Sequence, residues 1–327
     1  MALLVAIPMA FIPAFFFSWF LYWLDRYEKE PRWLLLITFF WGGFVAIIGT
    51  LIVASIFEIG FSLVLNDAVL EDIAGGSITA PLVEEFMKGL AVMVVFFIFR
   101  KEFDSVLDGV IYGGIAGLGF AATENVFYFM GQYADGGWGA MFTNFFLRVG
   151  VFAWGHPFYT AFTGLGFAVA RMNRNVLVKL AAPVIGYLLA VFAHAFHNTS
   201  LVFVSGLGSL ALIILLEWAS WVFFLGFIIW LIRHEQGLLK KHLREEITNG
   251  LINEAQYKTA ISFFQFGARM SALSSGAYRA TDHFYQYLGE LAHKKEQITK
   301  FGDERGNAAI IEKLRGNIAS LAPKAKT

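Results

Sequence analysis

The sequence contains no cysteine, which excludes disulfide bonds, thiolate nucleophiles and cysteine-ligated metals. Charged residues are also scarce, because Asp, Glu, Lys and Arg make up 15% of the 327 residues, whereas soluble domains carry about 25%. Positive and negative charges balance, and this argues against a nucleic-acid partner. No basic segment or Ala-x-Ala cleavage site accompanies the first apolar run, so we expect a retained helix there and no removed signal peptide.

The charges lie in short clusters between long apolar runs up to residue 232, whereas residues 233–327 are ordinarily polar. Several of these runs exceed the ~20 residues that cross the hydrocarbon of a bilayer. We therefore predict an all-α polytopic membrane helix bundle over residues 1–232 and a helical cytoplasmic tail over residues 233–327, with breaks near 249–250 and 274–276. About seven transmembrane helices are predicted, over residues 2–24, 33–65, 79–99, 106–130, 140–170, 177–204 and 207–232.

The segments that connect these predicted helices alternate in charge. Residues 25–32, 100–105 and 171–179 contain Lys and Arg, whereas residues 66–78, 131–139 and 204–209 contain neither. Because basic loops stay in the cytoplasm, the pattern places the N-terminus outside and the tail inside.

Four predicted spans carry clusters of ionisable or amide side chains. Such groups are costly in hydrocarbon and therefore indicate function. With the predicted orientation, a rise of ~1.5 Å per residue brings the four segments to similar depths in the outer half of the bilayer, so we expect one shared site. The candidate residues are Glu84, Glu85, Lys88, Glu124, Asn125, His156, His194 and Asn198.

Spacing within the helices refines this prediction. Glu84 and Lys88 stand four residues apart and are expected to form an ion pair. The side chains of His194 and Asn198 should project together, whereas His197 points away and is interpreted as a packing residue. Arg148 falls near the outer end of its span, where its guanidinium could simply reach the interface.

The residue types favour hydrolysis by an activated water. There is no Gly-x-Ser-x-Gly motif and no His-Glu-x-x-His motif, so neither a serine nucleophile nor the common zinc-protease helix is indicated. A buried carboxylate can take a proton from water, while imidazole and amide groups stabilise the developing oxyanion. This chemistry needs no cofactor and forms no covalent intermediate.

The motifs Glu84-Glu85-x-x-Lys88, Phe120-x-x-x-Glu124-Asn125, His156-Pro-Phe-Tyr-Thr160 and His194-x-x-x-Asn198 resemble those of the PrsW family of intramembrane proteases. More distantly they resemble the CAAX prenyl endopeptidases and Abi proteases. The similarity extends over about residues 24–207. It implies cleavage of membrane-anchored protein substrates in the cell (inner) membrane of a prokaryote, and in one branch of the family the substrates are anti-sigma factors, cut at site 1.

The resemblance also implies roles for individual residues. The pair Glu84 and Glu85 would supply the water-activating base, and His194 and Asn198 match the family's His-x-x-x-Asn element. The distant relatives have a histidine in their second motif where this chain has Glu124. We expect His156 to compensate for that difference, with Lys88 and Asn125 in supporting roles.

Two alternatives stay open. The same glutamates and histidines could bind Zn²⁺ through two His and one or two carboxylates, which would make the protein a metalloprotease. A transporter or lipid-binding protein could instead use the cluster to relay protons or hold an ionic ligand.

Overall fold

The computed structural model describes residues 1–65, 67, 70–71, 73–303 and 306–327, and over these residues the chain is helical and without strands. This confirms the predicted all-α class. The chain divides into two compact units, which we call the membrane unit (residues 1–22 and 30–226) and the tail unit (residues 23–29 and 227–327).

Five helical stretches of the described chain are long and apolar enough to cross a membrane, and they confirm a polytopic membrane bundle. They are Ala2–Leu24, Arg32–Val64, Val106–Arg171, Val176–Val202 and Leu207–Thr248. The predicted span at 79–99 is a helix, Ala80–Ile98, but three charged residues lower its hydropathy. The seven-span count and the orientation stay predictions.

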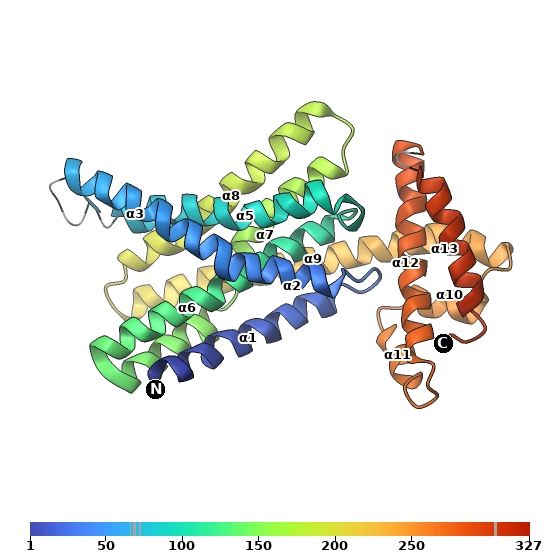
Figure 1. The fold of residues 1–327 in the computed structure, drawn as a ribbon, viewed down its shortest axis with the longest axis horizontal. Helices are drawn as coiled ribbons and strands as arrows, with labels where there is room; N and C mark the ends of the chain where they lie inside the picture. Colours follow the sequence, from blue (N-terminus) through green and yellow to red (C-terminus); the bar gives the residue numbers. More distant parts are fainter. Residues whose placement is uncertain (66, 68–69, 72, 304–305) are drawn as a thin grey trace. The chain divides into compact units, whose positions relative to one another are not determined.

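The membrane unit consists of long helices (Figure 1), and three short π-helical stretches of the described chain lie beside or between some of them. Its α-helices are α1 (Ala2–Leu24), α2 (Arg32–Phe40), α3 (Ile47–Val64), α5 (Ala80–Ile98), α6 (Val106–Phe145), α7 (Gly155–Arg171), α8 (Val176–Val202) and the first part of α9 (Leu207–Thr248). The π-helical stretches are η1 (Trp41–Ala46), η2 (Ile73–Thr79) and η4 (Phe146–Val151), and a 3₁₀ turn, η3, covers Arg100–Glu102.

Glycine allows α6 to pack against α7 backbone to backbone. A Cβ atom added to Gly117 of α6 would lie 2.4 Å from the carbonyl oxygen of His156, and one added to Gly109 would lie 2.3 Å from that of Gly164. Small residues permit such close approach between helices in a bilayer, where lipid tails provide no hydrophobic drive for association. The contact at Gly117 fixes the backbone of His156 against α6.

Residues 131–139, the predicted connection between two spans, are helical except at one position. Gly137 has φ 66° and ψ −156°, a conformation open to glycine. The chain doubles back there, since Phe129 before the turn and Phe145 after it pack with their ring centroids 5.9 Å apart. A single glycine thus makes a tight helical hairpin that returns residues 141–151 to the side of residues 124–129.

The tail unit contains the rest of α9 together with α10 (Glu254–Ala260), α11 (Phe266–Ser271), α12 (Tyr278–Phe301) and α13 (Asn307–Leu321). Both predicted breaks are confirmed, because Gly250 and Gly276 have positive φ values of 71° and 68°. The apolar face of α12, with Phe284, Leu288 and Leu291, is buried, and α12 packs against α13. The tail is therefore a folded helical unit.

Candidate active site

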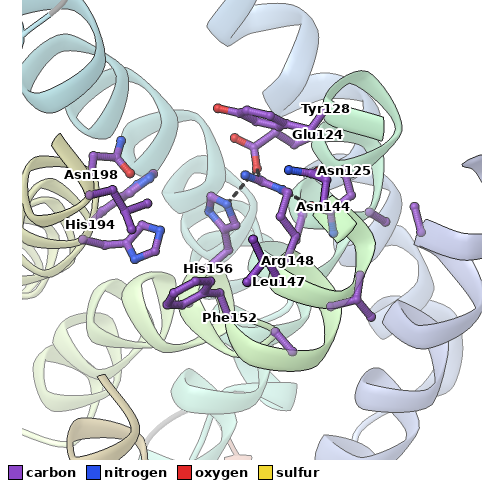
Figure 2. A pocket seen from close by; sticks show the side chains of 18 of the residues that line it. Glu124, Asn125, Tyr128, Asn144, Leu147, Arg148, Phe152, His156, His194 and Asn198 are labelled. Atoms are coloured by element: carbon purple, nitrogen blue, oxygen red, sulfur yellow. Dashed lines mark hydrogen bonds and ion pairs between the residues drawn. The ribbon is translucent and has the colours of Figure 1, made fainter. Parts of the chain in front are cut away.

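A cavity of about 490 Å³ lies within the membrane unit, between α1, α5, α6, η4, α7, α8 and the start of α9. Figure 2 shows the polar side chains that converge on it from separate helices. Six of the candidate residues lie on its wall: Glu84, Glu124, Asn125, His156, His194 and Asn198. The other two, Glu85 and Lys88, are fully buried beside them.

Lys88 does not favour the partner that its spacing suggested. Its ammonium lies 2.6 Å from Oε1 of Glu85 and 3.5 Å from Oε2 of Glu84. Both partners stand on the same edge of α5, and the i,i+3 contact with Glu85 is the closer. The Phe120 ring covers the ammonium with its centroid at 4.3 Å, so the cation is enclosed by carboxylates and an aromatic face.

The two adjacent glutamates have different environments. Glu85 contacts the Lys88 ammonium, accepts a hydrogen bond from the Thr160 hydroxyl at 2.8 Å and lies 2.9 Å from Nδ1 of His194. Glu84 faces the cavity, and its contacts with Lys88 and with Nε2 of His194 are longer, at 3.5 and 3.8 Å. Glu85 therefore holds its neighbours in place, while Glu84 is the carboxylate that can meet a substrate, water or metal ion.

Glu85 also fixes the orientation of His194. A carboxylate held by an ammonium is an acceptor, so Nδ1–H of His194 donates to Glu85 and the lone pair of the neutral ring lies on Nε2. Tyr159 stacks on this ring with a centroid distance of 4.9 Å and an interplanar angle of 17°. The lone pair on Nε2 consequently lies on the side of Glu84.

His156 is held in the same manner. Lys88 lies 3.1 Å from Nδ1, and because an ammonium can only donate, Nδ1 carries the lone pair. Nε2–H then donates to Oε2 of Glu124 at 3.0 Å. The two imidazole rings are close together, with centroids 5.0 Å apart.

Arg148 is part of the site, and the suggestion that it only reaches the interface is wrong. It comes from η4, on the returning arm of the hairpin at Gly137. It forms an ion pair with Glu124 and donates to Oδ1 of Asn125 (Figure 2). π-Helical segments often occur at functional sites. Here the segment directs a guanidinium into the cavity.

Asn198 lies near His194 on the cavity wall (Figure 2). Its Nδ2 donates to the carbonyl of Gly76 at 2.8 Å, which ties α8 to η2. The amide has a second N–H, so this bond still leaves one donor for a ligand.

Glu217 was not among the predicted site residues, and His197, interpreted as a packing residue, lies at the site. His197 lines the cavity and its Nδ1 hydrogen-bonds to Glu217, which is buried on α9. The Tyr159 ring contacts both His194 and His197, with centroid distances of 4.9 and 6.1 Å. A single acid within the apolar run 207–232 was the available signal for this pair.

The donor atoms of Glu84, His156 and His194 suit a metal ion. One ligand atom from each lies within 4.8 Å of the others. Two imidazoles and a carboxylate are a common zinc donor set that leaves a position for water or substrate. The second nitrogen of each ring pairs with a carboxylate, Glu85 or Glu124, as is usual for metal-binding histidines.

Comparison with known proteins identifies a family for this chain. The model of the family described as PrsW family intramembrane metalloprotease matches residues 30–231. A protein named Protease PrsW from Geobacillus kaustophilus is 34% identical over 112 residues, covering 34% of this chain and 46% of the relative. The Bacillus subtilis Protease PrsW is 30% identical over 118 residues, covering 35% and 48%. That of Oceanobacillus iheyensis is 26% identical over 189 residues, covering 57% and 78%.

The chain spans about half the length of the first two relatives. No solved structure matches it. The family match, however, covers well over half of this chain and includes every candidate residue named above. The chain therefore belongs to the PrsW family of intramembrane metalloproteases.

Proposed function

We propose that the protein is an intramembrane endopeptidase that cleaves membrane-anchored protein substrates, and that Glu84, His156 and His194 hold a divalent metal ion at its active site. The observation that carries the proposal is the convergence of these three donors within 4.8 Å of one another. The description of the family as metalloproteases and the name of the relatives support it.

The protein residues around the metal ligands would have distinct tasks. Glu85 and Glu124 keep the histidine lone pairs directed at the ligand position, and Lys88 balances the buried negative charge. Arg148 and Asn198 supply N–H donors on the cavity wall for substrate carbonyl groups. When bound, the metal would supply Lewis acidity to the peptide carbonyl and make water a better nucleophile.

A metal-free mechanism is the second candidate, and one contact favours it. The Lys88 ammonium lies 3.1 Å from Nδ1 of His156, at the lone pair that a metal would use. In this mechanism Glu84 takes the proton of water, as the sequence suggested, and its longer contacts leave it able to do so. His194 and Asn198 would bind the oxyanion, which requires a second proton on Nε2 of His194.

The substrate class follows from the position of the cavity among membrane helices. Ala10, Pro13 and Phe17 of α1 add apolar side chains to the lining of the cavity, which also carries the polar cluster. Such a mixed lining suits a peptide segment next to a membrane anchor. We propose an anti-sigma factor as the substrate on the strength of the family resemblance alone.

Metal analysis and chelation separate the two candidates. The purified full chain should contain bound zinc or another divalent ion, and His194→Ala and Glu84→Gln should each lose it. Glu58→Gln, a change at an exposed carboxylate on α3, is the matched control and should retain the ion. Cleavage of a single-span reporter protein should stop on chelation and return with Zn²⁺.

If chelation leaves cleavage unchanged while Glu84→Gln lowers it by about 10²-fold or more, the metal-free mechanism is correct. A folded wild-type protein that releases no product from single-span reporters, but accumulates a solute in vesicles, would contradict both forms of the proposal.

A further inference from the structure

The tail unit exposes a compact apolar surface. Beyond residue 233, the large hydrophobic side chains that the described chain leaves exposed all fall within ten residues: Phe264, Phe266, Met270 and Leu273 are exposed by 77, 51, 45 and 52%. We call residues 263–273 the aromatic segment. Exposed apolar clusters of this kind mark contact with a membrane or a partner.

One face of the aromatic segment is exposed, and the other is buried and anchored by an ion pair. Phe266, Met270 and Leu273 follow the i, i+4, i+7 spacing of one helical face and are exposed, whereas Ala268 and Ala272 face inward and are buried. Buried Arg269 anchors the inner face by an ion pair with Asp282 at 2.8 Å. The outward apolar face is therefore presented by ordered structure.

Arg26 connects the start of the segment to the end of a membrane helix. The guanidinium of Arg26 lies 3.5 Å from the centroid of the Trp23 ring and 4.5 Å from that of Phe263. Helix α1 ends at Leu24, so at most ~7 Å of chain separates Arg26 from the end of that helix. Tryptophan and arginine are typical of the level where a helix leaves the bilayer. Phe263 is thus held near that level.

The charge of the surrounding chain fits lipid headgroups. Between residues 255 and 281 the charged residues are Lys258, Arg269 and Arg279, and none is acidic. Lys258 and Arg279 are exposed. Basic residues beside an apolar helical face are the combination that binds the surface of an anionic bilayer.

We propose that the aromatic segment lies in the bilayer surface on the side of the tail, with Phe264, Phe266, Met270 and Leu273 among the upper acyl chains. Lys258 and Arg279 contact anionic headgroups. The tail unit is in this way attached to the membrane at a point separate from α9.

Because the chain has no cysteine, the proposal can be tested with single labels on the full-length protein. Phe264→Cys carries an environment-sensitive NBD dye, and Ser320→Cys, at an exposed polar position on α13, is the matched control. Both proteins are reconstituted in phosphatidylcholine–phosphatidylglycerol vesicles with and without a lipid that bears a nitroxide near its headgroup.

We expect emission at position 264 to be shifted to the blue and to be quenched several-fold more strongly than at position 320. Omission of phosphatidylglycerol should weaken that quenching. Equal spectra and equal quenching at the two positions would overturn the proposal. So would unquenched dye at 264 together with disulfide cross-links between copies of Phe264→Cys, which would assign the surface to self-association.

Discussion

Nδ1 of His194 lies 2.9 Å from Oε1 of Glu85, although 109 residues separate them in the chain. Both side chains are buried. Through this contact, a glutamate that does not line the cavity determines which nitrogen of His194 faces it.

The first prediction follows from this contact. Glu85→Gln replaces an acceptor by an amide that can also donate, so the imidazole is no longer held in one tautomer. We expect metal affinity to fall by about 10–100-fold, as on loss of other carboxylates that orient metal-binding histidines. Competition with a chromogenic chelator measures this affinity, with Glu58→Gln as the control. An unchanged affinity would show that Glu85 does not position the ligand.

Replacement of Lys88 by an uncharged residue should strongly lower the stability of the protein. It is fully buried beside two carboxylates, so Lys88→Met leaves negative charge without compensation and should cost about 3–5 kcal/mol. Adding Glu85→Gln to Lys88→Met should recover part of this loss, because one of the uncompensated charges is then removed. Unfolding in mixed detergent micelles measures both.

Lys179→Met is the control for this series, since Lys179 is exposed and its loss should change stability by no more than about 0.5 kcal/mol. A double variant less stable than Lys88→Met would contradict the role of Lys88 as counter-charge.

Because α6 and α7 are in close contact, one methyl group added at Gly117 should lower the stability of the protein. Gly117→Ala would place a Cβ 2.4 Å from the His156 carbonyl oxygen, so the helices must separate, at a cost of about 1–3 kcal/mol. Cleavage activity should fall as well, because His156 moves with the backbone of α7. Gly131→Ala on the same helix meets nothing within 4 Å and should be neutral or stabilising by up to about 1 kcal/mol. Similar thermal unfolding of the two variants would refute the argument.

Labelling tests the orientation. Gly139→Cys lies where an added side chain meets nothing within 4 Å, and Ser275→Cys is exposed in the tail unit. From the distribution of basic loops we expect an impermeant maleimide to label position 139 in intact cells and position 275 only after lysis. The opposite pattern would place the tail outside.

Protonation of Glu296 at acidic pH should destabilise the tail unit. Burial by itself would raise the pKa of this carboxyl, but hydrogen bonds from Lys241, His242 and Lys300 outweigh it and lower the pKa from 4.5 to about 2. A depressed carboxyl pKa stabilises the fold above the ordinary value, and this stability is lost as the pH falls from about 4.5 toward 2.

Hydrogen exchange of α12 amides, corrected for the intrinsic effect of pH, should therefore accelerate over that range in the wild type and less in Glu296→Gln. Glu254→Gln, at an exposed carboxylate 3.9 Å from Lys258, should follow the wild type. Identical profiles for all three proteins would contradict the assignment to Glu296.

The sequence was sufficient for the fold class because apolar runs of membrane length have no other stable arrangement than helices. It also identified six residues of the cavity wall, since charged groups in such runs are too costly to be incidental. It favoured Glu84 as the partner of Lys88, whereas the ammonium lies closer to Glu85. Both spacings place a carboxylate on the same helix edge, and the choice depends on Thr160 and His194 from other helices.

Other features had only a weak signal in the sequence. Asp135-Gly136-Gly137 is equally typical of a loop and of a tight helical turn, so the return of Arg148 to Glu124 was hidden. Likewise, an isolated acid such as Glu217 gives no indication of its partner until α8 and α9 are placed side by side.

The contacts of Glu124 and those of Glu85 differ in how far they reach along the chain. Glu124 contacts Arg148 and His156, which follow it in the chain by 24 and 32 residues. Glu85 contacts His194, which follows it by 109 residues. Contacts between nearby segments form sooner than contacts between distant ones. As helices enter the membrane from the N-terminus onward, one half of the site can assemble early, and the other half only when α8 has docked. The site would then be completed late in biogenesis, after α8 has docked.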